Sequence, residues 1–170
     1  GKTAGNIVFL LDALKGVLGT LLPSVLVSIG QMLPAERNPA DDFQLLAAGF
    51  VGTLLGHCFS IFLGFRGGKG VASTIGGLLV LLPVPVAIGA ALWAVAFYAT
   101  RYVSVASLVL GLSLPISCWL LPQFTGLRYG APEFWFAAAL AAFNVWTHRA
   151  NVVRLLRGEE SRFTRKEPQP

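Results

Sequence analysis

Charged residues are scarce in this sequence. Its 170 residues include 13 Lys and Arg and 8 Asp and Glu, so 12% are charged, whereas 55% are hydrophobic. A soluble domain carries about twice that share of charge. The composition excludes a disordered or collagen-like chain and disfavours an ordinary soluble enzyme. It predicts a membrane protein that crosses the bilayer several times.

Cysteine is also rare, and the familiar catalytic motifs are missing. Cys58 and Cys118 lie in apolar stretches, which is typical of small buried hydrophobic residues and not of a disulfide framework. The sequence has no G-x-S-x-G elbow, no C-x-x-C pair, no H-E-x-x-H and no His-x4-Asp dyad. Histidines and carboxylates are too few and too scattered for a recognisable metal site, so we expect neither metal nor cofactor. The phenylalanines lie within apolar runs, which argues against nucleic-acid binding.

Uncharged stretches indicate where the spanning helices lie. Lys, Arg, Asp and Glu are absent from residues 43–65, 71–100 and 102–127. A spanning helix needs about 20 mostly apolar residues, so the first and third stretches fit one helix each. Pro83 and Pro85 interrupt helical hydrogen bonding, and they divide the middle stretch into two helices.

We therefore predict an all-α, polytopic membrane helix bundle with about six spanning helices, one of them short. The predicted helices cover approximately residues 4–32, 43–65, 71–82, 86–100, 102–127 and 134–146. In this interpretation residues 1–160 form a single transmembrane domain, and residues 161–170 form a basic cytoplasmic tail.

The cations are distributed unevenly between the two ends of these helices. The six-helix topology leaves only Arg37 and Arg128 of the 13 cations at one face. The other face carries Lys2, Lys15, Arg66, Lys69, Arg101, Arg149, Arg154, Arg157, Arg162, Arg165 and Lys166. Cytoplasmic loops carry the excess of Lys and Arg, so the cation-rich face is predicted to be cytoplasmic.

A basic, glycine-rich loop, Arg66-Gly67-Gly68-Lys69-Gly70, joins two of the predicted helices. Its glycines allow a tight turn that points N–H groups at an anion, and the next helix adds its N-terminus. The loop is not a Walker A motif, because Gly70 stands where Ser or Thr would bind magnesium. By itself it is equally consistent with a phosphate site and with a positively charged cytoplasmic turn.

A polar stripe marks the place where the last spanning helix leaves the membrane. Asn144, His148 and Asn151 are spaced i, i+4, i+7, which places them on one face of a helix. Polar side chains at that depth usually face the bundle interior and mark a site. The alternative is a helix end whose amphipathic side chains reach toward the interface.

Three further polar residues lie within or beside predicted helices. Asp12 and Lys15 are spaced i, i+3, so an ion pair would stabilise both groups at the membrane edge, and we assign them a structural role. For His57 two interpretations stay open. A lone His in a helix is usually a satisfied core group, and the alternative is a catalytic group.

Four segments in this order resemble the bacterial acyl-phosphate:glycerol-3-phosphate acyltransferase family, often called PlsY. The similarity covers about residues 1–163, and the combination of the second and fourth segments is specific. The segments are Leu11 to Gly16, Gly56 to Ala72 (with His57 and the loop 66–70), Thr100 to Ser104, and His148 to Asn151 with Arg154, Leu155, Gly158 and Glu160.

The resemblance implies an enzyme of phospholipid biosynthesis in the cell inner membrane, with its active site facing the cytoplasm. Members of the family transfer an acyl group from acyl phosphate to the 1-hydroxyl of glycerol 3-phosphate, giving lysophosphatidate and phosphate. They need no cofactor. Acyl phosphate is an activated mixed anhydride, so positioning and stabilisation of charge at the attacked carbonyl are sufficient for catalysis.

Roles for individual residues follow from the resemblance and the residue types together. We expect His148, Asn144 and Lys69 to be catalytic. We expect Arg66, Gly67, Gly68, Gly70, Asn151 and His57 to bind substrate or its phosphate, and Glu160, Asp12 and Lys15 to be structural.

The resemblance also implies an additional N-terminal spanning helix, the first of seven, followed by a Ser-, Gly- and Asn-rich segment ending in Arg. This chain opens at Gly1, just past the place where that segment would end. A catalytically incomplete fragment of the acyltransferase is therefore one alternative. A transporter of a phosphorylated metabolite is another, although the sequence shows no internal repeat and its polar residues lie at one face.

Overall fold

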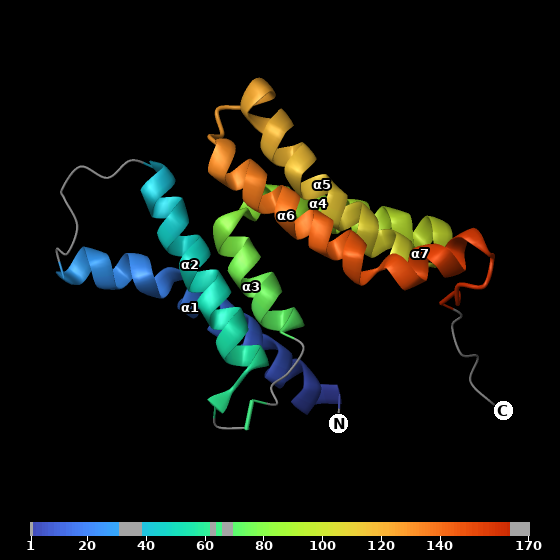
Figure 1. Cartoon of the computed structure of the whole chain (residues 1–170), viewed down its shortest axis with the longest axis horizontal. Helices are drawn as coiled ribbons and strands as arrows, with labels where there is room; N and C mark the ends of the chain where they lie inside the picture. The colour runs from blue at the N-terminus through green and yellow to red at the C-terminus, as the bar shows by residue number, and fades with distance from the viewer. Residues whose placement is uncertain (1, 31–38, 62–63, 66–69, 164–170) are drawn as a thin grey trace. The chain divides into compact units, whose positions relative to one another are not determined.

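The structure is all-helical in the part of the chain that it describes (Figure 1). This computed structural model describes residues 2–30, 39–61, 64–65 and 70–163. The helices are α1 (Lys2–Gly30), α2 (Pro39–Cys58), α3 (Val71–Leu81), α4 (Pro83–Thr100), α5 (Val103–Phe124), α6 (Ala131–Thr147) and α7 (Arg149–Leu156). They form two compact units, Gly1–Pro83 and Val84–Pro170. That residues 1–160 form one domain stays a prediction.

The six predicted helices correspond to α1 to α6, but the second one ends earlier than predicted. It stops at Cys58 and does not reach residue 65. Gly64 and Phe65 have positive φ angles of 60° and 61°, which a helix cannot accommodate. The N–H of Phe65 instead donates to the carbonyl of Ser60 at 2.9 Å, closing a turn. The segment is apolar, so the positions of charged residues did not indicate that a turn interrupts it.

A break at Pro83 separates α3 from α4, and α4 begins at an earlier residue than predicted. The helix α3 ends at Leu81, and Leu82 leaves the helical region with φ −136° and ψ 57°. The helix α4 then begins at Pro83, three residues before the predicted start at 86. Proline is accommodated in the first turn of a helix because no N–H is needed there. With 11 residues, α3 is about 16 Å long, the short helix that was predicted.

In the first unit α1 packs closely against α3. A Cβ added to Gly16 would collide with the backbone of Ser73, and one added to Gly76 would collide with the backbone of Ala13. Such small residues allow two helix backbones to approach without a hydrophobic driving force between them, as membrane helices require. This contact holds the first turn of α3 against the turn of α1 that carries Asp12 and Lys15.

In the second unit α5 and α6 lie side by side (Figure 1). Both helices bury small and medium side chains, among them the fully buried Ala106 of α5 and Ala137 of α6 and the nearly buried Leu114 and Cys118 of α5. The short helix α7 follows α6 after a single intervening residue, His148. This break places the polar residues of α7 next to the end of α6.

The helix surfaces suit a lipid environment. Three helices of the described part, Thr3–Gly30, Pro83–Thr100 and Val103–Phe124, are long and apolar enough to cross a membrane. Large apolar side chains stand on their outer surfaces, for example Leu10, which is 65% exposed, and Val95, which is 67% exposed. Exposure of so much continuous apolar surface to water is unfavourable, whereas lipid tails solvate it.

Candidate active site

Of the glycine-rich loop, residues 66–70, the structure describes only the last residue, Gly70. Gly70 caps the N-terminus of α3 in the left-handed conformation, with φ 70° and ψ 7°, which glycine adopts without strain. It provides no side-chain hydrogen bond to the helix. Gly70 therefore offers no side-chain cap to the first N–H groups of α3, which carry the partial positive charge of the helix end. Arg66, Gly67, Gly68 and Lys69 lie outside the described residues.

Near the start of α3, the structure brings His57 and Ser73 to the predicted pair of Asp12 and Lys15. Lys15 Nζ lies 2.9 Å from Asp12 Oδ1, at the spacing that predicts an ion pair, and 2.8 Å from His57 Nδ1. Ser73, in the first turn of α3, donates its hydroxyl to the backbone carbonyl of Asp12 at 3.0 Å. Its Oγ also lies 3.5 Å from His57 Nδ1. We call Asp12, Lys15, His57 and Ser73 the three-helix cluster, because α1, α2 and α3 each contribute to it.

The donors in the cluster determine which nitrogen of His57 carries the proton. A lysine ammonium group only donates hydrogen bonds, so His57 Nδ1 must accept the one from Lys15. The neutral ring then carries its proton on Nε2. The His57 side chain is 13% exposed, so packing restricts the rotation of the ring.

In the second unit, Glu160 binds three residues from two helices, α5 and α7. Its Oε1 accepts hydrogen bonds from Ser104 Oγ at 2.7 Å and from Asn151 Nδ2 at 2.9 Å. Its Oε2 accepts one from Arg154 Nε at 2.8 Å. The carboxylate therefore ties the segment after α7 to the start of α5 and to α7 itself.

These hydrogen bonds stabilise the ionised form of Glu160. They lower its pKa from 4.5 to about 2, with the amide of Asn151 as the largest cause, followed by the hydroxyl of Ser104 and the guanidinium of Arg154. Only 7% of the Glu160 side chain is exposed. Glu160 is therefore a permanent anion at physiological pH, in keeping with the structural role expected for it.

His148 lies at the C-terminal end of α6, and contacts with that helix end orient its ring. Its Nδ1 lies 2.9 Å from the backbone carbonyl oxygen of Asn144, and its own N–H donates to the same oxygen at 3.0 Å. A carbonyl oxygen only accepts hydrogen bonds, so Nδ1 must be the protonated nitrogen of the neutral ring. The other nitrogen, Nε2, then carries a lone pair and is able to accept a proton.

His148 and Asn151 face the same cavity, of about 350 Å³. The residues that line it are Val103, Ser104, His148, Asn151, Glu160, Ser161, Arg162 and Phe163. Beside it, Arg162 Nε donates to the hydroxyl of Tyr102 at 3.1 Å, and the N–H of Phe163 donates to the carbonyl of Arg101 at 2.8 Å. The segment after α7 thus folds back to form one wall of a polar cavity that contains one cation, Arg162, and one anion, Glu160.

Asn144 does not line this cavity, although it belongs to the same predicted stripe. Its side chain packs against Gly111 of α5, where an added Cβ would stand only 2.8 Å from Asn144 Cγ. The amide oxygen Oδ1 is buried and has no hydrogen-bond partner among the described residues. Gly111 is thus a residue that the sequence did not reveal, since nothing distinguishes it from other glycines in apolar helices.

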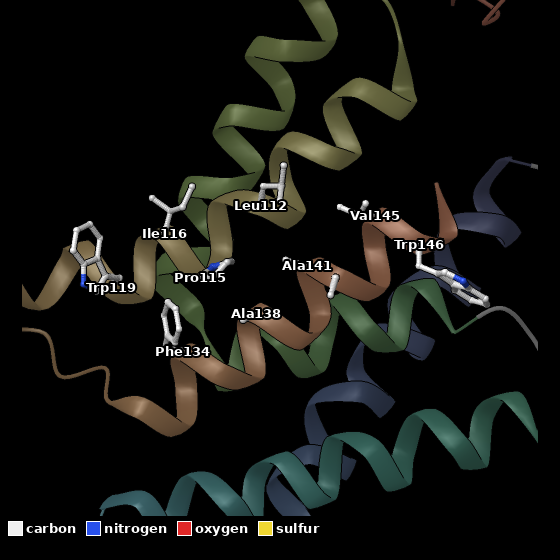
Figure 2. A pocket seen from close by; sticks show the side chains of 10 residues that line it. Leu112, Pro115, Ile116, Trp119, Phe134, Ala138, Ala141, Val145 and Trp146 are labelled. Atoms are coloured by element: carbon white, nitrogen blue, oxygen red, sulfur yellow. The ribbon is translucent and has the colours of Figure 1, made fainter. Parts of the chain in front are cut away.

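An apolar groove of about 890 Å³ runs between α5 and α6 (Figure 2). On α6 its lining residues recur at helical spacing and so share one face. Figure 2 shows these as Phe134, Ala138, Ala141 and Val145, opposite Leu112, Pro115, Ile116 and Trp119 of α5. From Phe134 to Val145 the groove follows α6 for about 16 Å. It ends within one helical turn of His148.

Together these features define a helical membrane protein with polar sites at the ends of its helices and an apolar groove beside one of them. The family profile described as Glycerol-3-phosphate acyltransferase matches residues 1–158. The chain belongs to this family, which confirms the resemblance and makes the protein an acyltransferase.

Individual relatives agree with this assignment. The chain is 40% identical over 163 residues to a glycerol-3-phosphate acyltransferase of Anaeromyxobacter sp. (strain Fw109-5), covering 96% of this chain and 73% of that one. It is 36% identical over 165 residues to one from Halalkalibacterium halodurans, covering 94% and 71%.

Two solved structures are also similar, each with 30% sequence identity and 96% of this chain covered. One is the glycerol 3-phosphate form of PlsY, an integral membrane glycerol 3-phosphate acyltransferase, with a TM-score of 0.66 and 73% of that chain covered. The other is the lysophosphatidic acid form, with a TM-score of 0.67 and 74% covered. These similarities confirm an integral membrane helical fold.

Proposed function

We propose that this protein transfers an acyl group from an acyl phosphate to the 1-hydroxyl of glycerol 3-phosphate, giving lysophosphatidate and phosphate. Family membership supports the acceptor, since a similar solved structure is described as a glycerol 3-phosphate form and another as a lysophosphatidic acid form. The observation that carries the proposal is the orientation of His148, whose Nε2 is the proton-accepting nitrogen of a ring that lines a polar cavity.

The chemistry needs a base, a place for phosphate and a place for the acyl chain. The hydroxyl oxygen of glycerol 3-phosphate attacks the acyl carbonyl carbon, and a tetrahedral oxyanion forms. The bond from that carbon to the phosphate oxygen then breaks, and phosphate leaves with the electron pair. His148 Nε2 takes the proton of the attacking hydroxyl, which makes it the general base.

The N-terminus of α3 and the loop before it bind phosphate in this proposal. Gly70 leaves the first N–H groups of α3 without a side-chain cap, which suits an anion at this helix end. The sequence predicts that Arg66 and Lys69 add the positive charge that a doubly charged phosphate needs. It also predicts that Gly67 and Gly68 allow a tight backbone turn.

The groove between α5 and α6 holds the acyl chain. Its lining is apolar over about 16 Å of helix, and its volume of about 890 Å³ lies within the range of ligand sites. Because the groove ends within one turn of His148, a chain lying in it would bring its carboxyl end toward the general base. Asn144 directly precedes Val145 of the groove lining, and its amide packs against Gly111; a catalytic role for Asn144 stays a prediction.

The cation-rich ends of the helices support a cytoplasmic location for the site, in the inner membrane. Arg101, Arg149, Arg154 and Arg162 all lie near the polar cavity or on the helices that border it. Cytoplasmic loops carry such an excess of Lys and Arg. Glycerol 3-phosphate would then enter from the cytoplasm, and the acyl phosphate from the bilayer.

The proposal is tested with the protein expressed from its own gene, in membranes supplied with palmitoyl phosphate and radiolabelled glycerol 3-phosphate. We expect lysophosphatidate as the labelled product, and about a 10²–10⁴-fold loss of turnover in His148→Ala, the usual contribution of a general base. Arg157→Ala, an exposed cation in the same segment, serves as the control. Uptake of label into vesicles without any product would indicate a transporter instead.

A further inference from the structure

The polar cavity beside α7 offers hydrogen-bond acceptors to a ligand, and Glu160 is the reason. An ionised carboxylate only accepts hydrogen bonds, so each group that binds Glu160 must turn a donor toward it. Ser104 therefore directs its hydroxyl hydrogen to Oε1, and Asn151 directs its Nδ2 to the same oxygen. The amide oxygen of Asn151, Oδ1, is turned away from Glu160 as a result.

Two acceptor atoms of the cavity lining are left without a partner. Among the described residues, neither Asn151 Oδ1 nor His148 Nε2 has a hydrogen bond, and neither atom is enclosed by protein. Both side chains line the cavity of about 350 Å³. They lie three positions apart where the chain is already helical, since the carbonyl of His148 accepts the N–H of Val152 at 2.9 Å. Side chains at this spacing are neighbours, with Cβ atoms about 5–6 Å apart.

The charges around the cavity do not suit a phosphate group. Among the described residues that line it, Arg162 is the one cation, and its Nε already donates to the hydroxyl of Tyr102 at 3.1 Å. Glu160, although paired with Arg154, places a negative charge in the lining that opposes a doubly charged phosphate. Two neighbouring acceptors suit instead a molecule with two adjacent hydroxyl groups, because each hydroxyl donates one hydrogen bond.

We infer that this cavity binds the two hydroxyl groups of glycerol 3-phosphate. The 1-hydroxyl donates to His148 Nε2, which takes its proton in the reaction, and the 2-hydroxyl donates to Asn151 Oδ1. Glu160 is a positioning residue, because it keeps the Asn151 amide turned with its oxygen toward the substrate. This assignment rests on the proposed function and adds to it a determinant of specificity for the acyl acceptor.

Two substrate analogues test the contact with the 2-hydroxyl. 3-Hydroxypropyl phosphate lacks this group, and dihydroxyacetone phosphate carries a carbonyl in its place, which accepts hydrogen bonds but cannot donate one. Both leave Asn151 Oδ1 unpaired. We therefore expect kcat/KM of the wild-type protein to be about 5- to 100-fold lower with either analogue than with glycerol 3-phosphate, the usual effect of an unpaired polar group. Equal use of dihydroxyacetone phosphate would overturn the inference.

Variants separate this contact from general support of the fold. Asn151→Leu keeps the size of the side chain and removes its acceptor, so the preference for glycerol 3-phosphate over 3-hydroxypropyl phosphate should disappear. Glu160→Ala frees the amide to rotate and should weaken the same preference, whereas a purely structural role would lower both rates equally. Glu160→Gln keeps one oxygen for the two donors at Oε1 and should preserve the preference, since the half-exposed Arg154 is able to turn away. Arg157→Ala, an exposed cation just after α7, is the control.

A binding measurement keeps the test independent of turnover. The purified protein, expressed from its own gene, is equilibrated with radiolabelled glycerol 3-phosphate, and each analogue is added as a competitor. Wild type should bind glycerol 3-phosphate more tightly than 3-hydroxypropyl phosphate, and Asn151→Leu should bind the two equally.

The two proposals fail in different ways. Preferential binding that is lost in Asn151→Leu, without any lysophosphatidate formed by wild type, would contradict the proposed function and leave the inference standing. Turnover with an unchanged preference in folded Asn151→Leu would overturn the inference and leave the proposed function standing. Because Asn151→Leu leaves the bonds of Glu160 to Ser104 and Arg154 in place, it decides the question even where Glu160→Ala does not fold.

Discussion

Replacing Gly111 by alanine tests whether the position of Asn144 matters for turnover. The added Cβ would stand 2.8 Å from Asn144 Cγ and 3.1 Å from its Oδ1. Carbon atoms in contact prefer at least about 3.5 Å, so Asn144 must move by roughly 0.7 Å. The backbone carbonyl of Asn144 also orients His148, so the shift reaches the proposed base. Misplacement of a reacting group by about 1 Å lowers rates on the order of 10²-fold, so we expect a 10- to 100-fold lower turnover.

Stability should change much less than turnover. Alanine is favoured over glycine in a helix by about 1 kcal/mol, and overpacking opposes this by about 1–3 kcal/mol. The net destabilisation of Gly111→Ala is therefore about 0–2 kcal/mol. Gly52→Ala is the matched control, because an added Cβ there meets nothing within 4 Å. Wild-type turnover in Gly111→Ala, measured as lysophosphatidate formed per folded protein, would refute the reasoning.

Two further predictions concern the groove and the Glu160 contacts. Ala138→Phe should fill the groove and lower kcat/KM for palmitoyl phosphate by about fourfold per excluded methylene, while a shorter acyl phosphate is affected less. Ala139→Phe, outside the groove lining, should not alter this chain-length profile. Because the folded pKa of Glu160 is about 2 and its ordinary value is 4.5, the segment after α7 is fully stabilised above pH 4.5. That stabilisation should fall as the pH drops from 4.5 toward 2, and the protection of the Phe163 amide from hydrogen exchange measures it. An identical pH profile in Glu160→Gln would contradict this origin.

The predictions that held were those that depend on charge and spacing along the chain. The absence of charge over 102–127 located α5, because the bilayer excludes charge from a spanning helix. The i, i+3 spacing brought Lys15 to Asp12, since helix geometry alone makes them neighbours. The end of α2 was missed because Gly64 and Phe65 form an apolar turn, which a count of charges does not detect.

Contacts between distant segments were not predictable in the same way. Nothing in the sequence indicates that Lys15 also bonds to His57, 42 positions away. Nor does the sequence show that Ser104 donates to Glu160, 56 positions away, or that Gly111 leaves room for Asn144. Each depends on which helix faces lie together.

The scarcity of charge and the order of the polar motifs determined by themselves that this is a helical membrane protein of the glycerol-3-phosphate acyltransferase family. The reason is that a lipid-exposed helix needs apolar residues, and helical periodicity fixes the spacing of polar ones. Both can be recognised along the sequence without knowledge of distant contacts. The tautomer of His57 was decided only by the tertiary structure. It depends on the ammonium of Lys15, which a neighbouring helix brings to Nδ1, and the direction of a hydrogen bond exists only once the atoms are placed.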